Sequence, residues 1–168
     1  MLVVRFKKIE NHPKSKIEFY NSINRIPLSI TIGDYLSLPN TIYCENALGQ
    51  NFIELRFDKD RKNLYEISLV TIQNDTVINK SLNKKVQTDE FYICNIVEGE
   101  SLLKDTLPIE IERDENSICI NLLNNKSSNI TYFHVSDNTF LGIDDDCYLI
   151  SIFINKLSDE NIKSIFGY

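Results

Sequence analysis

The side chains that could carry out chemistry are few and lie far apart in the sequence. The chain has two histidines, His12 and His134, and four cysteines. His134 lies in the apolar segment 132–135, where it could act as a base for a cysteine or a carboxylate that the fold brings close. We expect a structural histidine instead, because no nucleophile elbow or orienting motif surrounds it. The hypothesis of a small enzyme therefore rests on His134 alone.

The spacing of the cysteines argues against a metal or redox site. They stand at Cys44, Cys94, Cys119 and Cys147. None forms a C-x-x-C pair and none has a histidine close to it in the sequence, which excludes a zinc knuckle and a thioredoxin-type motif. We expect four buried free thiols.

Three consecutive carboxylates, at Asp144, Asp145 and Asp146, raise the question of a bound cation. They lack the alternating spacing of a calcium loop, and adjacent side chains cannot all point one way. The sequence also contains no P-loop, no dinucleotide-binding glycine motif and no H-E-x-x-H motif. We expect neither a metal nor a cofactor.

The charge balance bears on the kind of partner. The chain has 24 acidic and 18 basic residues, a net charge of −6 and a pI near 5.0. A protein that binds phosphate backbones needs a basic surface, so we expect no direct nucleic-acid binding. An acidic surface suits a basic protein partner, although the same charge could serve only to keep the protein in solution.

Acidic residues are concentrated in two segments, which we predict to form the partner-binding surface. They are Glu110, Glu112, Asp114, Glu115, Asp144, Asp145 and Asp146. Like charges two residues apart on a strand repel each other, and a basic partner would relieve that repulsion. The alternative is an ordinary solvated face.

The segment 52–72 is the clearest structural signal in the chain. Apolar residues alternate with polar ones in 52–57 and again in 65–69, and the six residues 58–63 between them are polar. This pattern predicts an antiparallel hairpin with one buried face. Weaker signals predict further strands at 2–7, 28–32, 41–44, 91–97, 107–123, 130–135 and 140–154, whereas 74–90 shows no periodicity.

Two segments have the spacing of amphipathic helices. In 15–24, apolar residues recur every three positions, which predicts a short N-terminal helix, with an edge strand as the alternative. In 158–166, Ser158 is a suitable N-cap before the apolar stripe of Ile162, Ile165 and Phe166. The expected fold is a single α+β domain spanning 1–168, a predominantly antiparallel β-sheet of hairpins with one N-terminal and one C-terminal helix.

The first ten residues do not have the pattern of a secretory signal, and no segment is apolar over a length that would span a membrane. We therefore expect a cytoplasmic protein with no membrane contact.

Three stretches are similar to bacterial immunity proteins of contact-dependent growth inhibition and polymorphic-toxin systems. They are NFIELRFDKDRKNLYEISLVTI at 51–72, LSITIGDY at 28–35 and FLGIDDDCYLISIFINKLS at 140–158. The resemblance implies a non-catalytic protein that binds a cognate toxin C-terminal domain, often a basic nuclease, and neutralises it by steric and electrostatic occlusion. The alternatives are a small cytosolic enzyme using His134 as base, or an adaptor subunit of a bacterial assembly.

Overall fold

The computed structural model describes most of the chain. The described residues are 2–11, 13, 15–19, 28–34, 39–59, 62–82, 84, 89–97, 107–122 and 129–166. This part of the chain contains thirteen β-strands, one turn of 3₁₀-helix and one α-helix. His12 lies outside the described residues, as do residues 20–24 of the predicted N-terminal helix.

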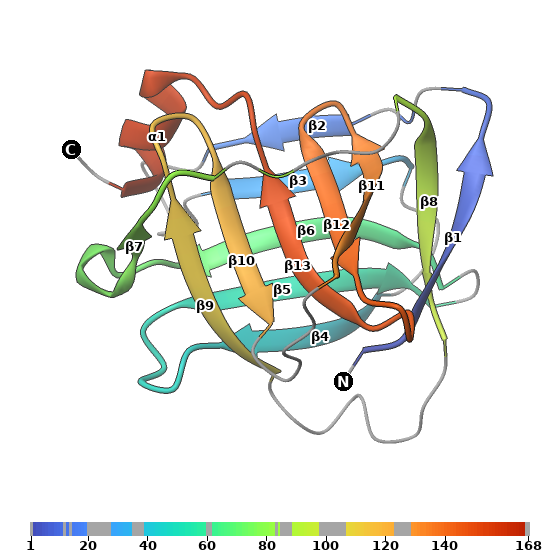
Figure 1. Cartoon of the computed structure of the whole chain (residues 1–168), viewed down its shortest axis with the longest axis horizontal. Coiled ribbons are helices and arrows are strands. Elements are labelled where there is room, and N and C mark those ends of the chain that lie inside the picture. Colours follow the sequence, from blue (N-terminus) through green and yellow to red (C-terminus); the bar gives the residue numbers. More distant parts are fainter. Residues whose placement is uncertain are drawn as a thin grey trace.

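Figure 1 shows the elements in their order along the chain, and nearly all of them are strands. The bounds are β1 (Val4–Ile9), β2 (Ser15–Glu18), β3 (Leu28–Ile32), β4 (Pro39–Glu45), β5 (Phe52–Asp58), β6 (Leu64–Thr71), the 3₁₀ turn η1 (Asn74–Thr76), β7 (Ile78–Asn79), β8 (Phe91–Ile96), β9 (Leu107–Arg113), β10 (Ile118–Leu122), β11 (Thr131–Ser136), β12 (Thr139–Ile143), β13 (Leu149–Ile154) and α1 (Asp159–Phe166).

The predicted α+β fold class is wrong, because the described chain is mostly β with one short C-terminal helix. The segment predicted as the N-terminal helix begins as strand β2, which pairs antiparallel with β3 and places Ile17 opposite Ile30. Ile17 packs against the core from the edge of the sheet. The edge-strand alternative is therefore correct for 15–18, since pairing with β3 outweighs a weak helical periodicity.

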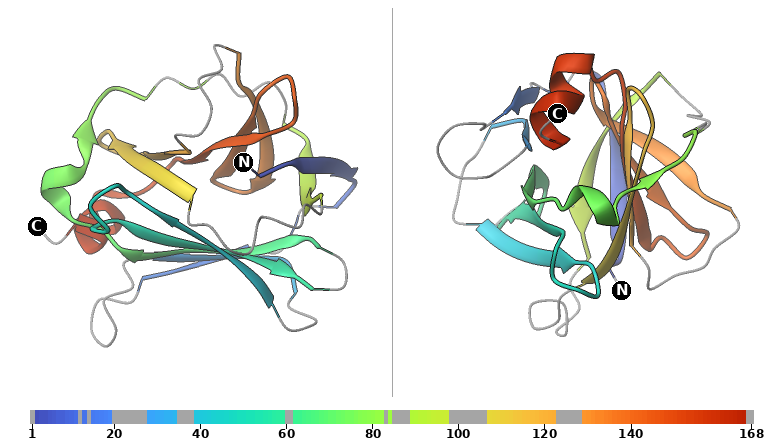
Figure 2. Two further views of the ribbon diagram at one scale, coloured as in Figure 1. Left: turned by 90° about the horizontal axis from the view of Figure 1, so that it is seen from below. Right: turned by 90° about the vertical axis from the view of Figure 1, so that its left-hand side faces the viewer.

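The strands form two facing layers (Figure 2). Their order along the sheet is β1-β8-β11-β12-β13-β10-β9-β4-β5-β6-β3-β2, with β7 beside β9. Pairing is antiparallel except for the parallel contacts β8–β11, β4–β9 and β7–β9. The β4–β9 contact carries the sheet from one layer into the other.

The two layers also meet on the opposite side, between β6 and β8. Asn63 forms an isolated antiparallel bridge with Asn95, and Ile96 N donates to Lys62 O at 2.9 Å. This seam closes the strands from β8 round to β6 into a flattened ring. Away from this bridge, β6 pairs with β5 and β3, whereas β8 pairs with β1 and β11.

The predicted hairpin at 52–72 is confirmed as β5–β6. Ile53, Leu55 and Phe57 are fully buried, as are Ile67 and Leu69 opposite them. Together with apolar residues of the other layer they form one continuous core. The register shifts between Arg56 and Phe57, so that the hairpin contains a bulge at its closed end.

The C-terminal helix is confirmed as α1. Ser158 Oγ accepts a hydrogen bond from Asn161 N at 3.1 Å, and Asn161 Oδ1 accepts one from Ser158 N at 3.0 Å. This reciprocal cap satisfies two backbone groups at the start of the helix. Ile162, Ile165 and Phe166 are buried in the core, as the stripe predicts.

Candidate functional site

The two predicted acidic segments do not form one patch, because the tip of the β9–β10 hairpin, with Asp114 and Glu115, and the turn at 144–147 lie at opposite ends of the sheet. Ile118, just after the tip of the β9–β10 hairpin, pairs with Ile154 at the end of β13. The turn at 144–147 lies before the start of β13 (Figure 1). Because β13 has six residues at about 3.3 Å each, Asp114 and Glu115 lie about 20 Å from the turn along the strand direction, whereas Glu110 lies nearer the middle of the sheet, in the same cross-strand row as Asn121 and Ser151.

Glu112 is buried rather than projecting into solvent. Its side chain is 8% exposed, and Glu112 Oε1 accepts a hydrogen bond from Lys80 Nζ at 2.9 Å. Burial acts to raise the pKa of Glu112, but hydrogen bonds from Lys80 and Asn121 and the nearby positive charge outweigh it and lower the pKa. Glu112 therefore anchors the segment 78–82 to the outer face of β9.

Asp114 has a similar internal role. Its Oδ2 accepts a hydrogen bond from Leu82 N at 3.0 Å, and its Oδ1 accepts one from Asn116 N at 3.1 Å. Leu82 in turn is buried against Cys119, Tyr132 and Phe153. Glu115 is exposed at this end of the sheet, and Glu110, nearer the middle, is half-buried.

The turn between β12 and β13 is built around the Asp144 carboxylate. Asp144 is 9% exposed, and its Oδ1 accepts hydrogen bonds from Asp146 N at 3.1 Å and Tyr148 N at 2.9 Å. Cys147 N donates to Asp144 O at 3.1 Å, and Cys147 has a φ of 63°. This is a three-residue hairpin loop that ends with a left-handed residue. Asp145 and Asp146 are left exposed at its tip.

The N-terminal residues hold this turn from the other side. Val4 N donates to Cys147 O at 3.0 Å, and Leu149 N donates to Leu2 O at 2.8 Å. Val3 forms an antiparallel bridge with Tyr148. The positions of Asp145 and Asp146 are thus determined by hydrogen bonds on both sides of the turn.

His134 lies between two phenylalanine rings on the outer face of the sheet. Its ring centroid is 4.3 Å from that of Phe91 and 4.3 Å from that of Phe140. Cys119 lies in the same cross-strand row as His134, because His134 pairs with Phe140, Phe140 with Phe153, and Phe153 with Cys119. The two residues are therefore three strand spacings apart, a distance of about 14 Å. The structure does not bring His134 and Cys119 within reach of a proton transfer.

The cysteines divide into two kinds, and all four are among the described residues. Cys44, Cys94 and Cys119 are buried, as expected. Burial raises the pKa of Cys44 to about 12 and that of Cys119 to about 11, and it also raises the pKa of Cys94, so all three are neutral thiols. The expectation of burial is wrong for Cys147, because the tight turn places its side chain in solvent.

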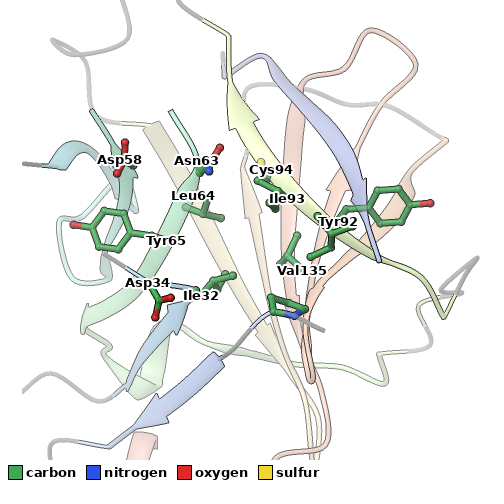
Figure 3. Close-up of a pocket in the computed structure, with 13 residues that line it drawn as sticks. Ile32, Asp34, Asp58, Asn63, Leu64, Tyr65, Tyr92, Ile93, Cys94 and Val135 are labelled. Atoms are coloured by element: carbon green, nitrogen blue, oxygen red, sulfur yellow. The ribbon is translucent and has the colours of Figure 1, made fainter. Parts of the chain in front are cut away.

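A pocket of about 270 Å³ lies beside the seam between β6 and β8 (Figure 3). Ile32 and Leu64 extend into it from one layer, and Ile93, Cys94 and Val135 form the facing wall from the other. Polar residues surround this apolar centre. They are Asp34, Asp58, Asn63, Tyr65 and Tyr92.

Sequence reasoning did not identify this pocket. Its lining comes from β1, β3, β5, β6, β8, β11 and the connections between them, so no contiguous motif encodes it. The only local signals were turn-forming residues, Gly33-Asp34 and the polar stretch 58–63. Gly33 has a φ of 76°, a conformation that favours glycine, and it turns the chain so that Asp34 follows at the edge of the pocket.

The chain defines a mostly-β protein whose two layers enclose one core and leave a small pocket at their seam. No protein-family model matches the sequence, and no curated protein matches it either. Within the described residues, no helix has the length and apolar character needed to cross a membrane, and no group of three His, Cys, Asp or Glu side chains could hold a metal ion.

Proposed function

We propose that this protein is a non-catalytic immunity protein that binds and neutralises a cationic toxin domain. The partner suggested by the resemblance is a cognate toxin C-terminal domain, a basic nuclease, and the compartment is the bacterial cytoplasm. The observation that carries the proposal is the turn at 144–147, which presents Asp145 and Asp146 to solvent on a fixed backbone.

Electrostatics supports a basic partner. Asp145 and Asp146 are adjacent and exposed, on a protein with a net charge of −6. Long-range attraction between such a surface and a cationic domain accelerates encounter and favours one orientation over others. Neither nucleic acid nor a membrane is part of the proposed contact.

The rigidity of the turn supports stoichiometric inhibition. A binding surface that is already ordered loses less conformational entropy when the complex forms. Asp144 positions the turn through its two hydrogen bonds to the backbone, and Asp145 and Asp146 make the contact. In this division of roles, Glu112 and Asp114 stabilise the fold at the other end of the sheet, and Glu115 and Glu110 are secondary.

Co-expression tests the proposal directly. The C-terminal domain encoded by the gene immediately upstream would be produced with and without this protein, and growth and co-purification recorded. We expect rescue of growth and a 1:1 complex of on the order of nanomolar affinity. A toxic domain that this protein neither relieves nor binds contradicts the proposal.

Association kinetics then test the surface. We expect the double variant Asp145→Asn, Asp146→Asn to associate with the toxin domain about 3–10-fold more slowly at low salt, with a weaker dependence on ionic strength. The matched control is Asp159→Asn with Glu160→Gln, which removes the same charge from exposed residues of α1 that are not part of the predicted contact. Equal effects of the two double variants would show that only net charge matters and that the turn is not the contact.

A substitution of His134 tests the alternative that the protein is an enzyme. His134→Phe keeps an aromatic ring between Phe91 and Phe140 but removes both ring nitrogens. We expect unchanged protection by this variant. Loss of protection in a variant that folds normally would favour the enzyme alternative.

A further inference from the structure

The pocket beside the β6–β8 seam is a distinct feature of the fold and does not depend on the proposed toxin contact. Its volume of about 270 Å³ exceeds that of an apolar cavity of about 150 Å³ that accepts benzene. It is also slightly below the usual range for drug-sized ligands, which begins at about 300 Å³. The size therefore suits a ligand with a single ring or a short alkyl chain.

The centre of the pocket is apolar. Ile32 and Leu64 face Ile93 and Val135 across it, and Figure 3 shows these four side chains directed toward the same space. Val135 and Leu64 are themselves buried in the core, which fixes their positions. An apolar group placed here would contact side chains from both layers and lose its contact with water.

The edge of the pocket carries negative charge. Two carboxylates, Asp34 and Asp58, lie on the side formed by β3 and the β5–β6 hairpin (Figure 3). Among the described lining residues none is a lysine, an arginine or a histidine. A ligand that carries a positive charge next to an apolar body is therefore favoured over an anion of the same shape.

Two tyrosines complete the lining, but they do not present their rings to the apolar centre. Tyr65 and Tyr92 line the pocket, one from each layer, and both rings extend away from its centre (Figure 3). The Tyr92 hydroxyl donates to Glu90 Oε2 at 2.9 Å, and its ring packs against Phe133, so the charge preference of the pocket rests on the carboxylates rather than on the rings.

We propose that this pocket binds a small organic cation, an amine with a single aromatic ring or a short alkyl chain. The apolar body occupies the space between Leu64 and Val135, and the ammonium group lies toward Asp34. The proposal is independent of the immunity function, since none of these residues belongs to the turn at 144–147.

The test uses two probes of matched shape and opposite charge, phenethylammonium and phenylacetate. Each would be titrated into the isotopically labelled full-length protein while methyl signals are followed by NMR. We expect phenethylammonium to shift the methyl signals of Ile32, Leu64, Ile93 and Val135 with saturation, at a dissociation constant on the order of 1 mM for a ligand of about nine non-hydrogen atoms. We expect phenylacetate to bind at least about 10-fold more weakly.

Three variants identify the site. Asp34→Asn should weaken phenethylammonium binding about 3–10-fold, and Ile32→Phe should abolish it by filling the pocket. Asp75→Asn, which removes an exposed carboxylate from η1, is the matched control and should change nothing. A methyl spectrum with unchanged dispersion in each variant confirms folding.

Two results would overturn the proposal. One is that neither probe shifts the pocket methyl signals up to about 20 mM, well above the expected dissociation constant. The other is that both probes bind with equal affinity, which would show an apolar pocket without charge selectivity.

Discussion

The hydroxyl of Tyr132 lies 2.9 Å from Ser151 Oγ, and both residues are buried on the outer face of the sheet. The contact spans strand β12, because Gly142 pairs with Tyr132 on one side and with Ser151 on the other. The absence of a side chain at Gly142 leaves room for the Tyr132 ring to reach across. Gly142 is thus required by packing rather than by backbone conformation.

We expect Gly142→Ala to destabilise the protein by about 1–3 kcal/mol, the usual cost of overpacking a buried site. A Cβ atom at this position would lie 2.4 Å from Ser151 Oγ, 2.7 Å from Ile130 Cγ2 and 2.9 Å from Tyr132 Cε1. Urea denaturation measures the change. Adding Ser151→Ala removes the shortest contact and should restore part of the loss, whereas a single variant as stable as the original protein would contradict this account.

The ion pair between Glu112 and Lys80 predicts a dependence of stability on pH. The pKa of Glu112 is lowered in the folded protein from its ordinary value of 4.5. A carboxylate with a lowered pKa stabilises the folded state above its unfolded-state pKa, and that stabilisation is lost as pH falls through the folded-state pKa. The free energy of unfolding of the original protein should therefore exceed that of Glu112→Gln at neutral pH, by about 1–3 kcal/mol.

The difference between the two proteins should shrink as pH falls below 4.5. Urea titrations at several pH values between about 7 and 3 measure it. Glu110→Gln is the matched control, because Glu110 lies two residues earlier on β9 and is half-buried. A difference between the original protein and Glu112→Gln that stays constant across this range would mean that the charge of Glu112 contributes nothing to stability.

The left-handed conformation of Cys147 predicts both a chemical and a conformational effect. Cys147 is the exposed thiol of the four, so iodoacetamide should modify one cysteine per chain under native conditions, as counted by mass spectrometry. Glycine adopts a φ of 63° without steric cost, whereas other residues lose about 1–2 kcal/mol there. Cys147→Gly should be as stable as the original protein or more stable by up to about 1 kcal/mol.

A β-branched residue at the same position should have the opposite effect. Cys147→Val should lower the free energy of unfolding by about 1 kcal/mol or more, because branching at Cβ adds crowding in the left-handed region. Thermal melts of the two variants are the measurement. Equal melting temperatures would mean that the turn relaxes and that its geometry is not fixed.

The elements whose pattern is local could be predicted from the amino-acid sequence. Alternation at 52–57 and 65–69 predicted the β5–β6 hairpin, and Ser158 with its apolar stripe predicted α1. In each case the residues that define the element lie within one hydrogen-bonded turn or one pair of adjacent strands. Short-range periodicity and capping are sufficient to predict such elements.

The side chains that cover each face of the sheet come from distant parts of the chain and could not be predicted in this way. Alternation on β9 correctly separated Ile111 from Glu112, but it could not show that segment 78–82 crosses over Glu112 and buries it. Three neighbouring aspartates looked equivalent in sequence, yet one is buried in the turn and two are exposed. The pocket at the β6–β8 seam assembles residues from both layers. Contacts between residues distant in sequence leave no periodic signal, so they emerge only when the layers pack together.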